Sequence, residues 1–324
     1  MGFWDGASVL VTGGAGFIGS HVVDALLRRG TAGVTVADDL SRGSLDNLRG
    51  VLDRVHVEKA DLRTTSECRR ICAGQRYILH LAGKVGGVGY NVAHPATMFR
   101  ENVRLSSNVI ESAVLERAER LLIVSSACVY RHDCTIPTPE SEGFTDWPEN
   151  TNEGYGWAKR MAEFEAMAAA EEHGLRSAVV RPCNAYGPRD HFDEEYSHVI
   201  AALIRRVEAG EDPLRVWGDG KTTRSFLYVE DFAEGILDLF ERCSEPDPVN
   251  LGTEEEVSIG ELARMILRLS GSRARLRFEP DKPSGQPRRR CDVSKAKALG
   301  FQPRVGLEEG LRRTLEWYRG SLGE

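Results

Sequence analysis

The segment Val9-Leu10-Val11-Thr12-Gly13-Gly14-Ala15-Gly16-Phe17-Ile18-Gly19 decides the fold predicted for this chain. Four residues of β-type character lead directly into a Gly-x-x-Gly-x-x-Gly turn, and residues 19–29 have the apolar spacing of an amphipathic helix. The glycines permit a tight turn and bring the backbone close to a pyrophosphate, whose charge then lies at the amide-rich start of the helix. The segment therefore predicts a dinucleotide-binding unit, with the cofactor-binding residues Gly13, Gly16, Phe17, Ile18 and Gly19.

An acidic residue follows the turn at the distance expected of a ribose-binding carboxylate. Asp38 ends the apolar run 34–37, about 20 residues after the glycines. A carboxylate there would accept hydrogen bonds from both ribose hydroxyls and repel a 2′-phosphate, which favours NAD over NADP. Arg42 could instead bind a 2′-phosphate, or it could be a solvated loop charge. The residues leave NAD and NADP open, and Asp38 favours NAD.

Short apolar runs alternate with longer helical segments throughout the first half of the chain. This pattern is typical of a parallel sheet covered by helices on both faces. Gly30 and Gly174 follow two of the helical segments, where a left-handed C-cap favours glycine. The predicted fold class is α/β, a Rossmann-type doubly wound parallel sheet. We expect strands near residues 8–12, 34–38, 55–59, 78–82, 121–125 and 178–181, and helices near 19–29, 102–118 and 155–173.

The character of the sequence changes after Pro182, where aromatic, glycine-rich and proline-rich loops separate fewer long elements. We therefore predict a dinucleotide-binding domain over residues 1–181 and a smaller substrate-binding α/β region over 182–324. An apolar run at 225–229 and a helical segment at 231–240 predict a further strand and helix. Residues 225–252 could thus return to the first sheet.

Composition excludes several classes of protein. The chain has 324 residues, and 42 lysines and arginines against 49 acidic residues give a formal net charge of −7, which argues against a general nucleic-acid or anionic-membrane binder. No apolar stretch approaches the roughly 18 residues of a membrane span, and residues 1–5 lack the basic start and apolar run of a secretory signal. The seven cysteines are scattered and match neither a disulfide framework nor a zinc-ligand array. We expect a cytoplasmic protein that keeps its cysteines as thiols and has no metal site.

Tyr155 and Lys159 are one helical turn apart, so both side chains lie on the same face of a helix. An ammonium group near a phenol stabilises the phenolate and should bring its pKa from about 10 toward neutrality, which suits proton exchange with a carbonyl or an alcohol. Ser126 follows the predicted strand 121–125, where an α/β sheet presents ligand-contacting residues. We interpret the three residues as a redox and acid–base site. The alternative interpretation is a polar strand end beside an ordinary surface pair.

With these motifs the chain resembles the extended short-chain dehydrogenase/reductase family, the nucleotide-sugar epimerases, dehydratases and reductases, over almost its whole length. The resemblance rests on residues 12–19, Asp61, Leu62, Asn102, Ser126, Tyr155 and Lys159. It implies that Asp61 and Leu62 contact the adenine side of the cofactor, and that Asn102, Tyr155 and Lys159 contact it elsewhere. Family habit also implies a homodimer packed through the helices 102–118 and 155–173.

Within that family, the chain is most similar to the GDP-L-fucose synthases, through residues 84–88, 151–156, 184–188, 197–200 and 282–288. Residues 125–128 and 217–226 are also similar to the GDP-mannose 3,5-epimerases. Both groups invert C3 and C5 of a hexose that carries a ketone at C4. The resemblance implies that Cys128 and His198 exchange the protons. A histidine at position 198, where the mannose epimerases carry a lysine, favours the synthases.

That inversion makes a defined chemical demand. A ketone at C4 acidifies the hydrogens on both neighbouring carbons, and each inversion needs one group to remove a proton and another to supply one from the opposite face. A thiol and an imidazole, with ordinary pKa values of about 8.5 and 6.5, can form such a pair near neutral pH. From spacing alone, Cys128 could equally be a small buried residue and His198 an ordinary surface residue.

The same resemblance implies the nucleotide-sugar contacts. It places Asn184 against the sugar and Arg206, Trp217, Arg224 and Lys282 against the nucleotide. Arginine forks suit diphosphate oxygens, and a tryptophan ring can stack on a nucleobase. Without the resemblance, Arg206 would be interpreted as a surface charge and Trp217 as a core residue.

The predicted function is a GDP-hexose 3,5-epimerase that acts through a 4-keto intermediate, with nicotinamide hydride transfer at C4. In a synthase-like version an external NADPH finally reduces the sugar, whereas in an epimerase-like version a retained NAD oxidises C4 and the same hydride returns. His198 favours the first version and Asp38 the second. A dehydratase would carry an Asp-Glu pair after the serine, where this chain has Ala127 and Cys128. The alternative from another class is a non-catalytic dinucleotide sensor, against which the intact Tyr–Lys pair argues.

Overall fold

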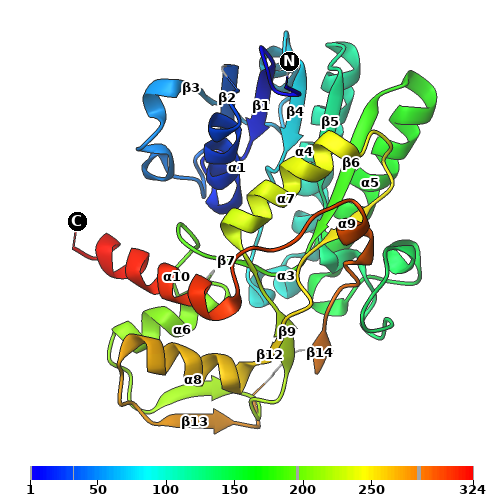
Figure 1. The fold of residues 1–324 in the computed structure, drawn as a ribbon. Helices are drawn as coiled ribbons and strands as arrows, with labels where there is room; N and C mark the ends of the chain where they lie inside the picture. Colours follow the sequence, from blue (N-terminus) through cyan, green and yellow to red (C-terminus); the bar gives the residue numbers. More distant parts are fainter. Residues whose placement is uncertain (1, 32, 195–196, 283–285, 324) are drawn as a thin grey trace.

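The computed structural model describes residues 2–31, 33–194, 197–282 and 286–323 of the 324-residue chain (Figure 1). Of the synthase-like match at 282–288, residues 283–285 therefore lie outside the described residues. Within the described ranges, no helix is both long and apolar enough to cross a membrane.

A parallel sheet occupies the upper part of the molecule in Figure 1. In the part of the chain that the structure describes, it has seven strands in the order β11-β6-β5-β4-β1-β2-β3. Strand order reverses at β1, which lies between β4 and β2, and ligands of such sheets bind beyond the carboxyl ends of the strands at this position. This architecture confirms the predicted fold class. The strands are β1 (Ser8–Thr12), β2 (Gly33–Asp38), β3 (Val55–Lys59), β4 (Tyr77–His80), β5 (Arg120–Val124), β6 (Arg176–Pro182) and β11 (Val249–Leu251).

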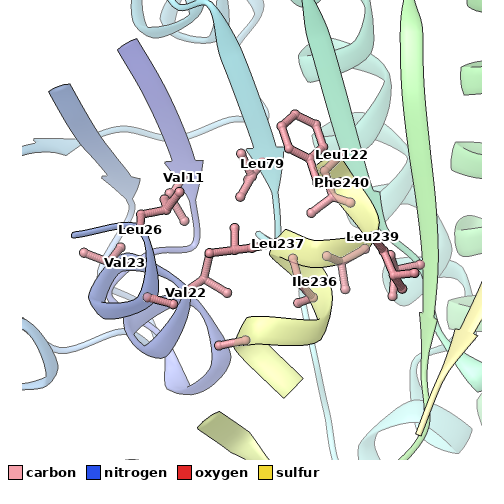
Figure 2. Packing of buried hydrophobic residues seen from close by; sticks show 14 of the residues in the cluster. Val11, Val22, Val23, Leu26, Leu79, Leu122, Ile236, Leu237, Leu239 and Phe240 are labelled. Atoms are coloured by element: carbon pink, nitrogen blue, oxygen red, sulfur yellow. The ribbon is translucent and has the colours of Figure 1, made fainter. Parts of the chain in front are cut away.

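Alternate side chains of each strand enter two separate cores. Val9 and Val11 of β1 belong to one apolar cluster, whereas Leu10 belongs to the other. Helices α1 (Phe17–Arg28) and α7 (Val229–Arg242) cover the first face. Figure 2 shows Val22 of α1 and Leu237 of α7 in the apolar cluster that these helices form with the strands. Each apolar side chain buried in this way contributes roughly 1.5–3 kcal/mol. The opposite face is covered by α2 (Thr65–Cys72), α4 (Pro95–Leu115) and α5 (Glu153–His173).

A smaller region below the sheet in Figure 1 has its own apolar core. Short strand pairs and a three-stranded sheet are packed there against helices from the second half of the chain. Its strands are β7 (Ala185–Tyr186), β8 (Leu214–Trp217), β9 (Thr223–Ser225), β10 (Leu227–Tyr228), β12 (Glu256–Ser258), β13 (Leu276–Glu279) and β14 (Arg288–Arg289). The remaining helices are α3 (Val88–Ala93), α6 (Val199–Glu208), α8 (Ile259–Ser270), α9 (Ser294–Ala298) and α10 (Leu307–Ser321).

Some predicted elements differ from those observed. The run 225–229 is not one strand, because β9 pairs with β12 and β14 whereas β10 pairs with β7, and α7 begins at Val229. The helix predicted at 102–118 begins earlier, at Pro95, whose fixed backbone angle suits a first helical position. Gly174 caps α5 with a φ of 69°, as predicted for a left-handed cap.

The expectation that every cysteine is a thiol is wrong for one pair. Cys183 and Cys291 form a disulfide although they are separated by 108 residues in the chain. Cys183 directly follows β6 and Cys291 lies two residues after β14, so the fold brings together two segments that the sequence keeps far apart. Scattered spacing carries no signal for such a pair. Among the described residues, the cysteines at 68, 72, 128, 134 and 243 are free.

Candidate active site

The glycine turn after β1 forms a cradle that excludes side chains. Gly13 has a φ of 70°, and a Cβ on it would lie 2.8 Å from the backbone nitrogen of Ala82. A Cβ on Gly19 would overlap the carbonyl of Gly13, so the start of α1 can pack this closely on the turn only with glycine. Gly16 caps α1 without a side-chain hydrogen bond, which leaves the first N–H groups of the helix available to an anion. Phe17 and Ile18 form the first turn of that helix. The predicted residues therefore fit the pyrophosphate of a dinucleotide.

Asp38 lies at the carboxyl end of β2, next to the glycine turn. Its Oδ2 accepts the backbone N–H of Ala15 at 3.1 Å, and its Oδ1 accepts that of Leu40 at 2.9 Å. Burial raises the pKa of Asp38, and the two backbone donors partly oppose that rise. The guanidinium of Arg42 donates to the carbonyl of Val85 at 2.9 Å. This arrangement places the Asp38 carboxylate beside the glycine turn and leaves the choice between NAD and NADP open.

Asn102, on α4, fixes the loop that follows β4. Its Oδ1 accepts the backbone N–H of Lys84 at 2.9 Å, and its Nδ2 donates to the Lys84 carbonyl at 3.0 Å. Each such bond stabilises the fold by about 1 kcal/mol. Asp61 accepts two hydrogen bonds from the Arg63 guanidinium, and the neighbouring Leu62 is buried. Asn102 therefore shapes the loop between β4 and α3 through its hydrogen bonds, and Asp61 and Leu62 follow β3 at the same edge of the sheet.

Ser126, Tyr155 and Lys159 come together beyond the end of β5. Ser126 caps a short 3-10 turn at 127–129, and its Oγ accepts the backbone N–H of Cys128 at 3.1 Å. A hydrogen bond between Ser126 and Tyr155 joins the strand end to α5. Lys159 is buried, with its Nζ 5.5 Å from the centre of the Tyr155 ring and donating to the Val124 carbonyl at 2.9 Å. This is the constellation that the sequence predicts.

The titration of these groups differs from the prediction. Burial raises the pKa of Tyr155, the nearby Cys128 raises it further, and the hydrogen bond from Ser126 opposes both effects. Burial also lowers the pKa of Lys159 to about 8, while Glu163 and Cys128 oppose this shift. The expectation of a lowered Tyr155 pKa is therefore wrong for the protein alone, because desolvation of the phenolate outweighs the effect of the distant ammonium group.

Cys128 belongs to the same site. Its effect on the titration of both Tyr155 and Lys159 places the thiol beside them. Gly156, on the first turn of α5, permits this approach, because a Cβ there would overlap the Cys128 carbonyl. The Arg289 guanidinium reaches Cys128 from β14, with Nη2 3.7 Å from Sγ. A thiol, a phenol and two cationic side chains thus lie near one another beyond the end of β5.

His198 lies at the N-cap of α6 and contacts a different set of residues. Its Nδ1 is 2.9 Å and 3.1 Å from the two carboxylate oxygens of Asp190. The imidazole keeps about half of its surface accessible (53%), whereas the Asp190 side chain is 1% exposed. In the described part of the chain, no hydrogen bond joins His198 to Cys128. The pairing of these two residues therefore remains a prediction.

The predicted substrate residues occupy several places in the smaller region. Asn184 donates to the Ser225 carbonyl at 2.9 Å, and Arg224 pairs in register with Arg289 across the β9–β14 ladder. Burial and the charge of Arg289 lower the pKa of Arg224 to about 10, as for a cation that faces another cation away from water. Trp217, at the end of β8, is 61% exposed, and Lys282 is also exposed. Arg206 instead forms an ion pair with Glu211 on the surface of α6.

Two further functional candidates, Asp190 and Arg289, are not among the site residues predicted from the sequence. Each lies just after a motif named above: Asp190 is two residues beyond the motif at 184–188, and Arg289 is one residue beyond the motif at 282–288. Alternation along β14 carries the signal for Arg289, because its neighbour Arg288 pairs with Glu256 on the opposite side of the strand. Asp190 and His198 are eight positions apart in the sequence, a spacing that no helix or strand periodicity reveals.

Comparisons with known proteins identify the family of this chain. The sequence profile of the NAD dependent epimerase/dehydratase family matches residues 9–252, and the chain belongs to that family. GDP-L-fucose synthase 1 of Arabidopsis thaliana is 33% identical over 318 residues, covering 96% of this chain and 93% of the relative. A dTDP-4-dehydro-6-deoxy-D-allose reductase of a Streptomyces species is also 33% identical, covering 98% of this chain and 97% of the relative.

A solved structure matches the whole fold. The UDP-glucose 4-epimerase of Thermotoga maritima with UDP-glucose superposes with a TM-score of 0.88 at 32% identity, covering 97% of this chain and 99% of that chain. The protein is accordingly an NAD(P)-dependent enzyme of the extended short-chain dehydrogenase/reductase type that modifies nucleotide sugars.

Proposed function

We propose that this enzyme inverts C3 and C5 of a GDP-hexose through a 4-keto intermediate, with hydride transfer at C4, in the manner of a GDP-L-fucose synthase. The observation that carries this proposal is the thiol of Cys128 within the Ser126–Tyr155–Lys159 site. An enzyme that only transferred hydride would not require an ionisable group there. The 33% identity to a GDP-L-fucose synthase over almost the whole chain supports the same substrate class.

The residues divide the work between two reactions. Ser126 and Tyr155 donate hydrogen bonds to the C4 oxygen, which withdraws electrons from C4 and acidifies the hydrogens on C3 and C5. Cys128 and His198 exchange protons with these carbons from opposite faces of the ring. The glycine turn, Asp38 and Asn102 hold the dinucleotide, which when bound supplies or accepts the hydride at C4. Tyr155 delivers a proton to the C4 oxygen as the ketone is reduced.

The smaller region binds the nucleotide part of the substrate. Arg224 carries a charge that the protein only partly solvates, and a diphosphate would neutralise it. Trp217 offers an exposed ring for stacking on guanine, Lys282 adds positive charge, and Asn184 reaches the sugar. Arg206 takes part only if its ion pair with Glu211 opens. Calorimetric titration with GDP, UDP and dTDP tests the base, and we expect GDP to bind most tightly.

Deuterium exchange tests the epimerase activity directly. The purified protein is incubated with GDP-4-keto-6-deoxy-D-mannose in deuterated water, and the sugar is analysed by mass spectrometry. We expect deuterium at both C3 and C5 with the wild-type protein, and loss of exchange in Cys128→Ala and His198→Ala. Tyr155→Phe separately tests hydride transfer, because it should block reduction of the sugar while dinucleotide affinity stays largely intact. Full exchange in the double variant Cys128→Ala/His198→Ala would refute the proposal.

A redox-neutral epimerase is the second candidate, and Asp38 is the observation that favours it. Its carboxylate stands at the end of β2, where it would meet a 2′-phosphate with like charge. Such an enzyme would retain NAD and convert a GDP-hexose without net reduction. Mass spectrometry of the dinucleotide that copurifies with the protein separates the two versions. The same measurement, combined with incubation with GDP-mannose, also tests for a dinucleotide sensor, which would bind cofactor and convert nothing.

A homodimer is the assembly that we propose. Helices α4 and α5 pack side by side on one face of the sheet and keep large apolar side chains exposed, Phe99 on α4 at 39% and Phe164 on α5 at 59%. A second copy of the chain would cover both through the same helix pair, in the symmetric manner usual for such enzymes.

A further inference from the structure

We infer that Asp190 is a positioning residue for His198: its carboxylate fixes which imidazole nitrogen faces the substrate and keeps the ring charged when it must donate a proton. This inference rests on the proposed function, because it assigns a partner to the proton-exchanging group of that reaction. Neither the comparisons nor the sequence motifs assign a role to Asp190.

The hydrogen-bond geometry determines the tautomer. Both oxygens of Asp190 lie within 3.1 Å of His198 Nδ1, so the proton on Nδ1 is directed at the carboxylate. The other nitrogen, Nε2, is then left to exchange protons with a ligand. The carboxylate is buried while the imidazole is half exposed, which suits a fixed anchor and a working group that reaches solvent or substrate.

The loop that carries Asp190 is itself anchored to the cofactor helix. His21 of α1 hydrogen-bonds the carbonyl of Pro188 through Nε2 at 3.1 Å, and Arg189 forms an ion pair with Asp24 of α1 at 2.8 Å. Arg189 has a φ of 66°, a strained backbone conformation for a residue with a Cβ, and it directly precedes Asp190 in the chain. The helix that begins at the dinucleotide turn therefore also sets the orientation of His198.

Charges around the imidazole act in opposite directions. Partial desolvation of the ring disfavours the protonated form of His198, and the charge of Arg42, in the loop after β2, also disfavours it. Asp190 favours it both by charge and by hydrogen bonding, and the net effect raises the pKa of His198. His191, whose pKa is lowered mainly by burial, also faces this group. With its pKa raised, His198 remains protonated to higher pH and loses its proton only as the pH rises through that value.

Two substitutions separate the charge of Asp190 from its hydrogen bond. Asp190→Asn keeps an oxygen that can accept from Nδ1 and removes the charge, so we expect the alkaline limb of the C3/C5 deuterium-exchange rate to move down by about one pH unit. Asp190→Ala removes both, and we expect the maximal exchange rate to fall about 100-fold. Glu194→Gln is the matched control, because it removes from the same loop the carboxylate of a side chain that is 86% exposed and pairs with Arg205, and its pH profile should equal that of the wild-type protein.

A second measurement does not depend on activity. Nitrogen-15 spectra of histidine-labelled protein report the tautomer and the titration of His198, whose signals are assigned by their loss in His198→Asn. We expect a protonated Nδ1 in the wild-type protein and a lower titration midpoint in Asp190→Asn. Thermal unfolding and dinucleotide affinity of each variant show whether the fold is retained, and Asp190→Asn, which is isosteric, guards against collapse of the alanine variant.

The outcomes distinguish failure of the positioning role of Asp190 from failure of the proposed function. If the wild-type protein exchanges deuterium and Asp190→Asn changes neither the pH profile nor the nitrogen-15 spectrum, the positioning role is overturned and the proposed function stands. If the wild-type protein exchanges neither hydrogen, the proposed function fails and the role of Asp190 in it fails as well. A loss of thermal stability in both variants with an unchanged pH profile would assign Asp190 a purely structural role and would also overturn the inference.

Discussion

Tyr155 and Lys159 illustrate, at the scale of single residues, how burial modifies what spacing predicts. Their separation of four positions places them on one helix face, and the structure shows the predicted grouping with Ser126. The direction of the Tyr155 pKa was nevertheless mispredicted, because a sequence contains no information on how much water surrounds a phenol. Residue types indicate the chemistry of this site, whereas its titration depends on packing.

The depressed pKa of Lys159 predicts the pH dependence of hydride transfer. Because burial lowers this pKa to about 8, the charged fraction of Lys159 falls as the pH rises through that value. We expect kcat/KM for reduction of the keto sugar, followed by the absorbance of the reduced cofactor, to decline above about pH 8. Lys159→Arg keeps its charge at all accessible pH values and should remove this alkaline decline. An unchanged profile in the arginine variant would assign the decline to another group.

Gly19 gives a second prediction at the same scale. A Cβ there would overlap the Gly13 carbonyl, so Gly19→Ala must separate α1 from the glycine turn. We expect at least a 10-fold weaker dinucleotide affinity by fluorescence titration, because the helix N-terminus then no longer faces the pyrophosphate. Gly50→Ala is the control, since a Cβ at that position meets no atom within 4 Å. Equal affinities of the two variants would argue against a pyrophosphate at this turn.

At the scale of elements, α5 serves two purposes with two faces. Lys159 lies on its inner face, below the end of β5, and Phe164 lies on its solvent face. The length and capping of α5 were predicted closely, since glycine ends it at position 174. The start of α4 was missed by seven residues, because Pro95 can begin a helix as readily as it can end a loop.

The exposed face of α5 predicts the oligomeric state. Phe164→Glu places a charge in the centre of the proposed dimer face, where it would be desolvated without a partner. We expect this variant to have half the mass of the wild-type protein in light scattering coupled to size-exclusion chromatography. Glu316→Gln, at an exposed position of α10, changes charge on a different helix and should leave the mass unchanged. A monomeric wild-type protein would contradict the proposal.

At the scale of the whole molecule, the second half of the chain completes the first. Strand β11 pairs with β6 at one edge of the main sheet, and α7 covers the same face as α1. The alternating pattern of apolar runs predicts the sheet because each strand or helix is encoded by a short, continuous stretch of sequence. The disulfide and the Asp190–His198 contact depend on which loops meet, and local patterns do not contain that information.

Because β11 and α7 complete the main sheet and its core, a truncated chain that lacks them should not fold normally. A fragment of residues 1–181 lacks α7, so the side chains that Phe232, Ile236 and Phe240 cover would be exposed. Because each buried apolar side chain contributes roughly 1.5–3 kcal/mol, the loss of these three side chains alone is comparable with the whole stability of a typical domain. We expect the fragment to be insoluble or to lack a cooperative thermal transition in circular dichroism. A cooperative transition like that of the full chain would show that residues 1–181 fold independently.

The position of α7 has a practical consequence for engineering. One way to exchange substrate preference between relatives is to join the N-terminal half of one protein to the C-terminal half of another at residue 181. Such a chimera would replace α7, which covers one face of the dinucleotide-binding sheet, together with the substrate-binding region. In a better chimera, the host protein keeps its own residues 229–251, which form α7 and β11, and takes only residues 182–228 and 252–324 from the donor. The substrate-binding region would then come from the donor, while the dinucleotide-binding sheet would keep the helix and the strand that complete it in the host.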